Sequence, residues 1–161
     1  MFGGISGGLL NDMHTFDFKT EKWTKESQKG SYEIMPDNKI PEEDKFGIDL
    51  RGKVLTNITE KRFGHSLVPH KDILILYGGE EKYNKKKKKR DMFNDLYIFR
   101  VKDNVWKKVH WREKVIYGRK HHASTIIGRS MVIHGGLIPS NNVVDEFLCL
   151  DVTTSKWSDV K

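Results

Sequence analysis

Residues 62–79 read RFGHSLVPHKDILILYGG, and residues 119–136 read RKHHASTIIGRSMVIHGG. The two stretches align without a gap: each opens with an arginine, has a histidine three residues later and ends with two glycines. Self-similarity at fixed spacing is the sequence signature of repeat architectures. The chain therefore contains at least two copies of one structural unit.

The repeat continues beyond each glycine pair. A tryptophan closes each copy, and an acidic residue precedes it by eleven positions. A third, truncated copy opens with Phe2-Gly3-Gly4 and closes with Trp23. The landmark residues, all interpreted as structural, are Gly3, Gly4, Asp12, Trp23, His65, Gly78, Gly79, Asp95, Trp106, His122, Gly135, Gly136, Glu146 and Trp157.

The landmarks predict strands. Residues 73–77 form a continuous apolar and aromatic run, as expected of a strand buried on both faces, and residues 130–134 are its counterpart. The glycine pair at the end of each run is suited to positive φ or to a close backbone approach. Residues 95–101 and 146–152 predict third strands, followed by short polar turns. Each complete copy thus predicts a four-stranded antiparallel meander.

This order of histidine strand, Gly-Gly strand, acidic residue and tryptophan resembles the kelch repeat. The resemblance implies an all-β, kelch-type β-propeller segment of about three four-stranded antiparallel blades, of which the first is incomplete. We expect blade 1 at residues 1–29, an insertion loop at 30–60, blade 2 at 61–110 and blade 3 at 118–161. Because propellers have about four to eight blades, we expect further blades from a longer chain or from self-association.

Tryptophan and histidine landmarks have structural and functional interpretations. We predict that the three repeated tryptophans pack between blades, because a buried Trp hides about 150–250 Å². For His65 and His122, a structural hydrogen-bonding role is favoured over that of a catalytic base. His121 and His122 cannot bind one metal together, because adjacent strand residues point to opposite faces. The sequence therefore predicts no metal site and no cofactor.

Composition indicates a cellular setting. No apolar run approaches the roughly 20 residues that span a bilayer, and residues 1–10 lack the basic start and long apolar core of a secretory signal. The single cysteine, Cys149, excludes an intrachain disulfide and fits a reducing compartment. We expect a cytoplasmic protein, or a nuclear one if residues 85–90 act as an import signal.

The net charge of +7 is concentrated in one loop. Without residues 85–90, which contribute six positive charges, 23 basic residues face 22 acidic ones. The run has several interpretations: a solvated loop, a nuclear-import signal, a contact for nucleic acid or acidic surfaces, or a partner of the acids at 42–44. Few aromatic residues accompany the lysines, so nucleic-acid binding is not favoured.

Loop placement suggests a protein partner. If strands alternate in direction, every long connection emerges on one face, where binding residues usually lie on rigid scaffolds. We expect Arg62, Arg119 and Trp111 to contact a partner there, and the basic run offers further candidates. These are Lys85, Lys86, Lys87, Lys88, Lys89 and Arg90.

The sequence thus favours a non-catalytic protein–protein interaction module, in the manner of a kelch scaffold or adaptor. It shows no nucleophile elbow, phosphate-binding glycine loop or metalloprotease histidine pair. Two alternatives remain open. In the first alternative, the chain is part of a kelch-propeller enzyme or a phosphatase-associated domain. In the second, it is a nuclear or nucleic-acid-associated protein that uses the lysine-rich loop.

Overall fold

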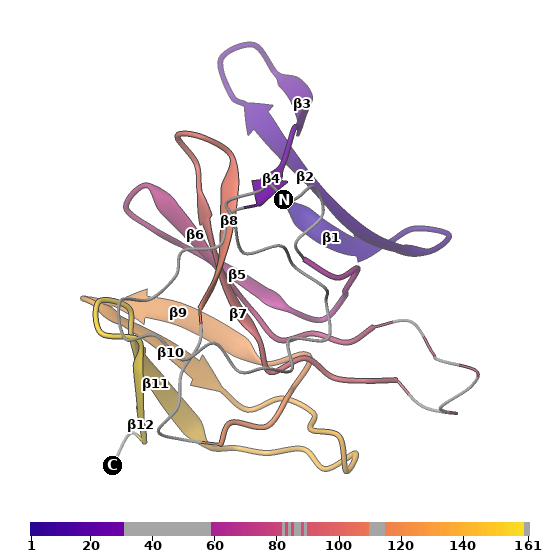
Figure 1. The fold of residues 1–161 in the computed structure, drawn as a ribbon, viewed down its shortest axis with the longest axis vertical. Coiled ribbons are helices and arrows are strands. Elements are labelled where there is room, and N and C mark those ends of the chain that lie inside the picture. Colours follow the sequence, from indigo (N-terminus) through magenta and orange to yellow (C-terminus); the bar gives the residue numbers. More distant parts are fainter. Residues whose placement is uncertain are drawn as a thin grey trace, which may run out of the picture.

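The computed structural model describes residues 1–30, 59–81, 83, 85, 88, 90–109 and 115–159. Their strands form three sheets, called blades 1, 2 and 3 in chain order, and the blades are stacked beside one another (Figure 1). Blade 1 consists of β1 (Phe2–Ile5), β2 (Leu9–Asp17) and β3 (Lys22–Glu26). Blade 2 contains β5 (Ser66–His70), β6 (Ile73–Tyr77), β7 (Leu96–Arg100) and β8 (Val105–Val109). Blade 3 contains β9 (Ala123–Ile127), β10 (Ser130–His134), β11 (Phe147–Asp151) and β12 (Lys156–Asp159).

The predicted meander is confirmed in blades 2 and 3. Neighbouring strands pair antiparallel in the order of the chain, and β6 and β10 have the bounds that the apolar runs predicted. The short strand β4 (Lys29–Gly30) was not predicted. It pairs in parallel with the start of β8, and the Lys29 amide donates to the Asn104 carbonyl at 2.8 Å. Residues 31–58 of the predicted insertion lie outside the described residues.

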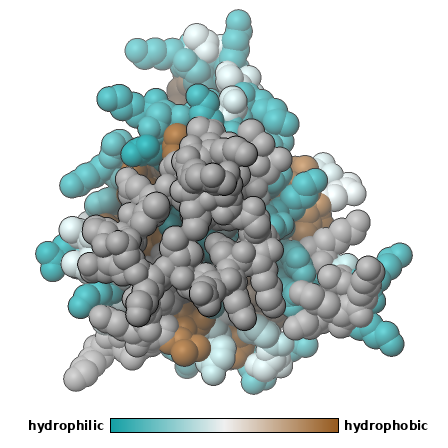
Figure 2. Space-filling model, viewed as in Figure 1, coloured by the Kyte–Doolittle hydropathy of each residue, from teal (hydrophilic) through white to brown (hydrophobic). Residues whose placement is uncertain are grey.

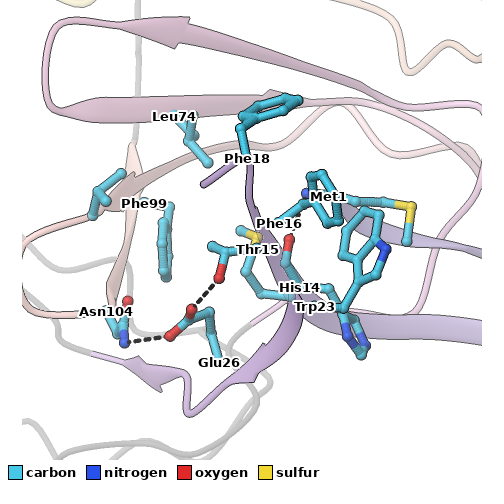
Figure 3. Close-up of a pocket in the computed structure, with 12 residues that line it drawn as sticks. Met1, His14, Thr15, Phe16, Phe18, Trp23, Glu26, Leu74, Phe99 and Asn104 are labelled. Carbon is cyan, nitrogen blue, oxygen red and sulfur yellow. Dashed lines mark hydrogen bonds between the residues drawn. The ribbon is translucent and has the colours of Figure 1, made fainter. Parts of the chain in front are cut away.

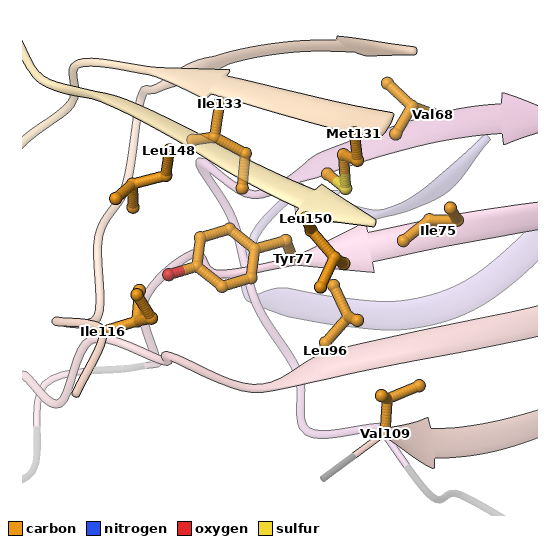
Figure 4. Packing of buried hydrophobic residues seen from close by; sticks show 10 residues of the cluster. All are labelled: Val68, Ile75, Tyr77, Leu96, Val109, Ile116, Met131, Ile133, Leu148 and Leu150. Carbon is orange, nitrogen blue, oxygen red and sulfur yellow. The ribbon is translucent and has the colours of Figure 1, made fainter. Parts of the chain in front are cut away.

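The hydrophobic core lies between the blades. On one face of blade 2, Leu76, Phe99 and Trp106 pack against Phe2 and Met13 of blade 1. On its other face, a larger cluster joins blade 2 to blade 3, and Figure 4 shows the Tyr77 ring pointing among side chains from both. This cluster contains Val68, Ile75, Tyr77, Leu96, Val109, Ile116, Met131, Ile133, Leu148 and Leu150. Each blade therefore depends on a neighbour to cover its apolar face.

The first glycine of the blade 2 pair is required by a close contact between blades. All six glycines have positive φ, and Gly78 lies at φ 67°. A Cβ atom added to Gly78 would lie 2.6 Å from the Arg119 carbonyl oxygen of blade 3. Side chains are rare at positive φ and none fits at this distance, so the glycine allows blade 3 to approach.

Long and short connections lie at opposite ends of the blades. Two-residue turns join β5 to β6 and β9 to β10, whereas the β6–β7, β8–β9 and β10–β11 connections are longer and lie at the other end (Figure 1). The predicted segregation of loops is confirmed for blades 2 and 3. In blade 1 the equivalent β1–β2 connection has only three residues, 6–8.

Replacing Gly78 with alanine is expected to destabilise the fold by about 2 to 4 kcal/mol, because the methyl group adds both backbone strain and overlap with blade 3. Urea unfolding followed by circular dichroism measures the change. Gly8→Ala is the matched control, since a Cβ at Gly8 meets nothing within 4 Å. Equal stability of the two variants would contradict the role assigned to Gly78.

Candidate interaction surface

Arg62 is a buried structural residue. Its side chain is 0% exposed, and its Nη1 and Nη2 atoms donate to Asp95 Oδ1 and Oδ2 at 2.5 and 2.9 Å. Nη1 also donates to the Gly78 carbonyl at 2.9 Å, and the Phe93 ring lies 4.1 Å from the guanidinium carbon. A bidentate pair of this kind fixes both partners in orientation as well as in charge.

Arg119 repeats this arrangement in blade 3. Its side chain is 1% exposed, its Nη1 donates to the Gly135 carbonyl at 3.0 Å, and its Nη2 donates to Glu146 at 2.5 Å. Arg62 and Arg119 were expected to contact a partner on the face of the long loops. That expectation is wrong about where their side chains lie. Both guanidinium groups are buried and are bonded to residues of their own blade.

The repeated histidines lie between blades. The His65 ring meets Phe2 of blade 1 edge-on at 5.6 Å, and the His122 ring meets Tyr77 of blade 2 at 5.4 Å. His122 Nε2 also lies 2.8 Å from Ser66 Oγ. Burial, assisted by the charge of the nearby arginine, lowers the pKa of each histidine to about 4. Both rings are therefore neutral at physiological pH.

The three tryptophans do not share one environment. Trp106 is 1% exposed and lies against Phe2 of blade 1, and Trp157 lies against Tyr77 of blade 2. These two confirm the predicted packing between blades. Trp23 is 59% exposed, so that prediction is wrong for blade 1. Among the described residues, the Phe16 ring lies 5.0 Å from the Trp23 ring, and no blade covers the outer side of Trp23.

The long-connection end has a rigid base. Isolated bridges extend blade 2 through Phe63, Glu80 and Met92, and a matching set extends blade 3. The buried Glu80 carboxylate forms ion pairs with Lys120 Nζ at 2.7 Å and with Arg90 Nη1 at 3.5 Å. Sequence reasoning missed Glu80, because nothing in its local pattern marks it as a partner of residues ten and forty positions away.

Exposed apolar side chains lie on the long connections. We define the loop-end surface as Tyr83, Arg90, Val115, Tyr117 and Val143, all exposed and contributed by three different connections. Surface residues in Figure 2 are mainly hydrophilic, with separate hydrophobic patches. Exposed apolar groups within a polar surround are a feature of interaction sites.

The remaining predicted contacts are only partly described. Lys85 and Lys88 lie in turns within the β6–β7 connection, and Arg90 binds Glu80. Lys86, Lys87, Lys89 and Trp111, together with the acids at 42–44, lie outside the described residues.

An open pocket of about 460 Å³ lies at the rim of blades 1 and 2 (Figure 3). Leu74 and Phe99 contribute apolar walls, and the Glu26 carboxylate accepts hydrogen bonds from Thr15 and Asn104 at 2.5 and 3.1 Å. Across the described ranges no group of three or more His, Cys, Asp or Glu residues could hold a metal ion. Those ranges also contain no helix that is long and apolar enough to cross a membrane.

The stacked blades, with tryptophan and histidine at each internal interface, define a segment of a β-propeller. The chain belongs to the kelch-repeat family, because residues 51–161 match the KLHDC2/KLHL20/DRC7 Kelch-repeats domain. A solved structure titled "Structure of YjhT" is similar with a TM-score of 0.64 and 18% identity, over 99% of this chain and 47% of that one.

Curated relatives are much longer than this chain. The Leucine-zipper-like transcriptional regulator 1 homolog of Drosophila melanogaster is 36% identical over 47% of this chain and 7% of its own length. Acyl-CoA-binding domain-containing proteins 5 and 4 of Arabidopsis thaliana are 26% and 21% identical over 99% and 98% of this chain. The aligned region covers 22% and 20% of those two proteins.

Arg62→Ala is expected to destabilise the fold by about 3 to 5 kcal/mol, because it leaves the Asp95 carboxylate without its cation in a largely buried setting. Urea denaturation provides the measurement. Arg100→Ala, which breaks an exposed pair with Asp103, should cost less than about 1 kcal/mol. A loss at Arg62 as small as that at Arg100 would refute the structural role.

Acid is expected to weaken the contacts between blades. Below pH 6.5 the unfolded chain protonates His65 and His122, whereas the folded chain keeps both neutral down to about pH 4. Their stabilising contribution is therefore complete above pH 6.5 and is lost as pH falls from 6.5 toward 4. Urea unfolding at pH 7.5, 6 and 5 tests this. His122→Asn should flatten the pH dependence, and a variant whose pH dependence equals that of the wild type would contradict the assignment.

Proposed function

We propose that this chain is a non-catalytic protein-interaction segment that binds partner proteins through its loop-end surface. The observation that carries the proposal is the grouping of long connections at one end of stacked blades. Three separate connections supply exposed tyrosine, valine and arginine side chains at that end. Binding residues are concentrated on loops that a rigid scaffold positions.

The base of each connection supports a preorganised surface. Phe63 and Glu80 exchange two backbone hydrogen bonds, at 3.3 and 2.9 Å, and Lys120 and Leu137 exchange another two, at 3.0 and 2.9 Å. The Glu80 carboxylate adds its contacts to Lys120 and Arg90. A surface that is already ordered loses less conformational entropy on binding. These contacts favour recognition by a fixed group of loops.

The relatives support a binding role in a second way. The region similar to this chain recurs in proteins whose names mention transcriptional regulation in one case and acyl-CoA binding in two others. A module that accompanies such different activities is more readily understood as a recognition unit than as the source of any one of them.

We place the interaction in the cytoplasm on the basis of the unpaired Cys149.

Affinity capture tests the proposal. The 161-residue chain and a Tyr117→Ala/Val143→Ala double variant are immobilised, and the proteins that each retains from a cell extract are quantified by mass spectrometry. The matched control is Val101→Ala/Ile127→Ala, which removes exposed apolar side chains beside the short turns. Proteins bound by the wild type should remain on the control and fall about tenfold or more on the loop-end variant.

Equal retention on all three proteins would overturn the loop-end assignment, and selective loss on the control would move the site to the short-turn end. Circular dichroism checks that both double variants are folded. Binding through phosphate contacts weakens steeply as the salt concentration rises from about 50 to about 200 mM. If the retained material is nucleic acid and its binding shows this salt dependence, the nucleic-acid alternative replaces the proposal.

A further inference from the structure

Four side chains from two complete blades meet where the long connections leave blades 2 and 3. The Phe63 ring, half-buried just before β5, lies at their centre. The Arg90 guanidinium carbon lies 5.8 Å from this ring, Lys120 Nζ lies 5.6 Å from it, and the His121 ring meets it at 6.0 Å. Three nitrogen-bearing side chains from the β6–β7 and β8–β9 connections therefore surround one aromatic ring.

Positive charge exceeds negative charge in this cluster. The Glu80 carboxylate, 2% exposed, pairs with Lys120 through one oxygen at 2.7 Å and with Arg90 through the other at 3.5 Å. The side chains of Lys120 and Arg90 are 15% and 44% exposed, so solvent reaches both cations. One carboxylate against two cations leaves one uncompensated positive charge. Glu80 thus holds the two cations in place without neutralising both, which favours the binding of a further anion.

His121 occupies a strained backbone position. Its φ is 56°, and Gly64, the equivalent residue of blade 2, has φ 67°. Glycine adopts such a φ freely, whereas other residues rarely do. The His121 amide donates to the Gly64 carbonyl at 2.8 Å, so this contact between blades needs only the backbone. Strain of this kind is concentrated at functional sites, and the exposed imidazole supplies a hydrogen-bond donor next to Lys120.

We propose that Arg90, Lys120 and His121 bind the phosphate group of a phosphorylated residue in a partner protein. This inference rests on the protein-binding function proposed above and names the chemistry of the segment that binds. A phosphorylated side chain carries about −1.5 to −2 charge at pH 7 and has three acceptor oxygens. Three donor side chains match the number of those oxygens, whereas a carboxylate has only two.

The surroundings of the cluster favour a protein as the source of the phosphate. Residues 80–91 contain seven basic and three acidic residues, so the β6–β7 connection attracts an anionic segment toward Arg90. Tyr117 and Val143 are exposed at the same end of the blades, where residues flanking the phosphorylated one can pack on them. A nucleic-acid strand needs stacking platforms for its bases, and Tyr83 is the single aromatic residue of 80–91.

Fluorescence anisotropy with peptide pools tests the inference. Each pool has mixed residues around one fixed position, which is phosphoserine, serine or glutamate. The wild-type chain should bind the phosphoserine pool about tenfold more tightly than the glutamate pool, because glutamate lacks the third oxygen and the additional negative charge. The serine pool should bind more weakly still. Arg90→Gln and His121→Gly should each weaken binding of the phosphoserine pool about tenfold.

The His121→Gly variant separates binding from folding. It gives blade 3 the glycine that blade 2 has at this position, so its stability in urea should be close to that of the wild type. Lys71→Gly is the matched control, because Lys71 also has a positive φ, at 54°, but lies in the β5–β6 turn at the opposite end. The control should bind the phosphoserine pool as the wild type does.

Three results would overturn the inference. These are equal binding by His121→Gly and Lys71→Gly, equal affinity for the phosphoserine and glutamate pools, and tighter binding of a short single-stranded DNA than of the phosphoserine pool. If His121→Gly does not fold, wild-type affinity in Arg90→Gln overturns it. A chain that retains proteins through Tyr117 and Val143 but binds no phosphoserine pool contradicts this inference alone and leaves the proposed function standing.

Discussion

A buried arginine in each complete blade joins the strands of its own sheet and the neighbouring sheet at the same time. The Arg62 side chain binds Asp95 and the Gly78 carbonyl within blade 2. Its backbone bonds to blade 1, where its amide donates to the Leu10 carbonyl and its carbonyl accepts from the Gly4 amide. One residue thus fixes the start of a blade, the end of its second strand and the approach of the preceding blade.

The arginine restricts what its surroundings can contain. A buried guanidinium must keep a carboxylate partner, since an unpaired buried charge costs several kcal/mol. The same close approach leaves no space for a side chain on Gly78, where an added Cβ would lie 2.6 Å from the Arg119 carbonyl oxygen of the next blade. The exposed side chains of Val115, Tyr117 and Val143 on the long connections take no part in this contact. The contacts between blades and the exposed loop side chains are therefore separate parts of the repeat, as a binding scaffold requires.

Sequence reasoning succeeded where local pattern determines structure. The runs at 73–77 and 130–134 were predicted as strands because unbroken apolar sequence fits a sheet buried on both faces. It failed for Arg62 and Arg119, whose residue type suggests exposure and whose carboxylate partners lie 33 and 27 positions away. It also missed β4, since a two-residue parallel pairing leaves no periodic signal. These errors share a cause: each feature depends on contacts between distant segments.

Blade 1 has a different ion pair at the position that the aspartate or glutamate partner of the arginine occupies in blades 2 and 3. Asp12 occupies the position of Asp95, but its partners are His14 at 3.0 Å and Lys25 at 3.4 Å, and its side chain is 25% exposed. The hydrogen bond from His14 lowers the pKa of Asp12, yet such an accessible pair contributes little stability. Blade 1 is held mainly by Phe2 and Met13 against blade 2. In a stack whose stability comes from contacts between neighbours, the packing of Phe2 and Met13 against blade 2 therefore matters more to blade 1 than its internal ion pair does.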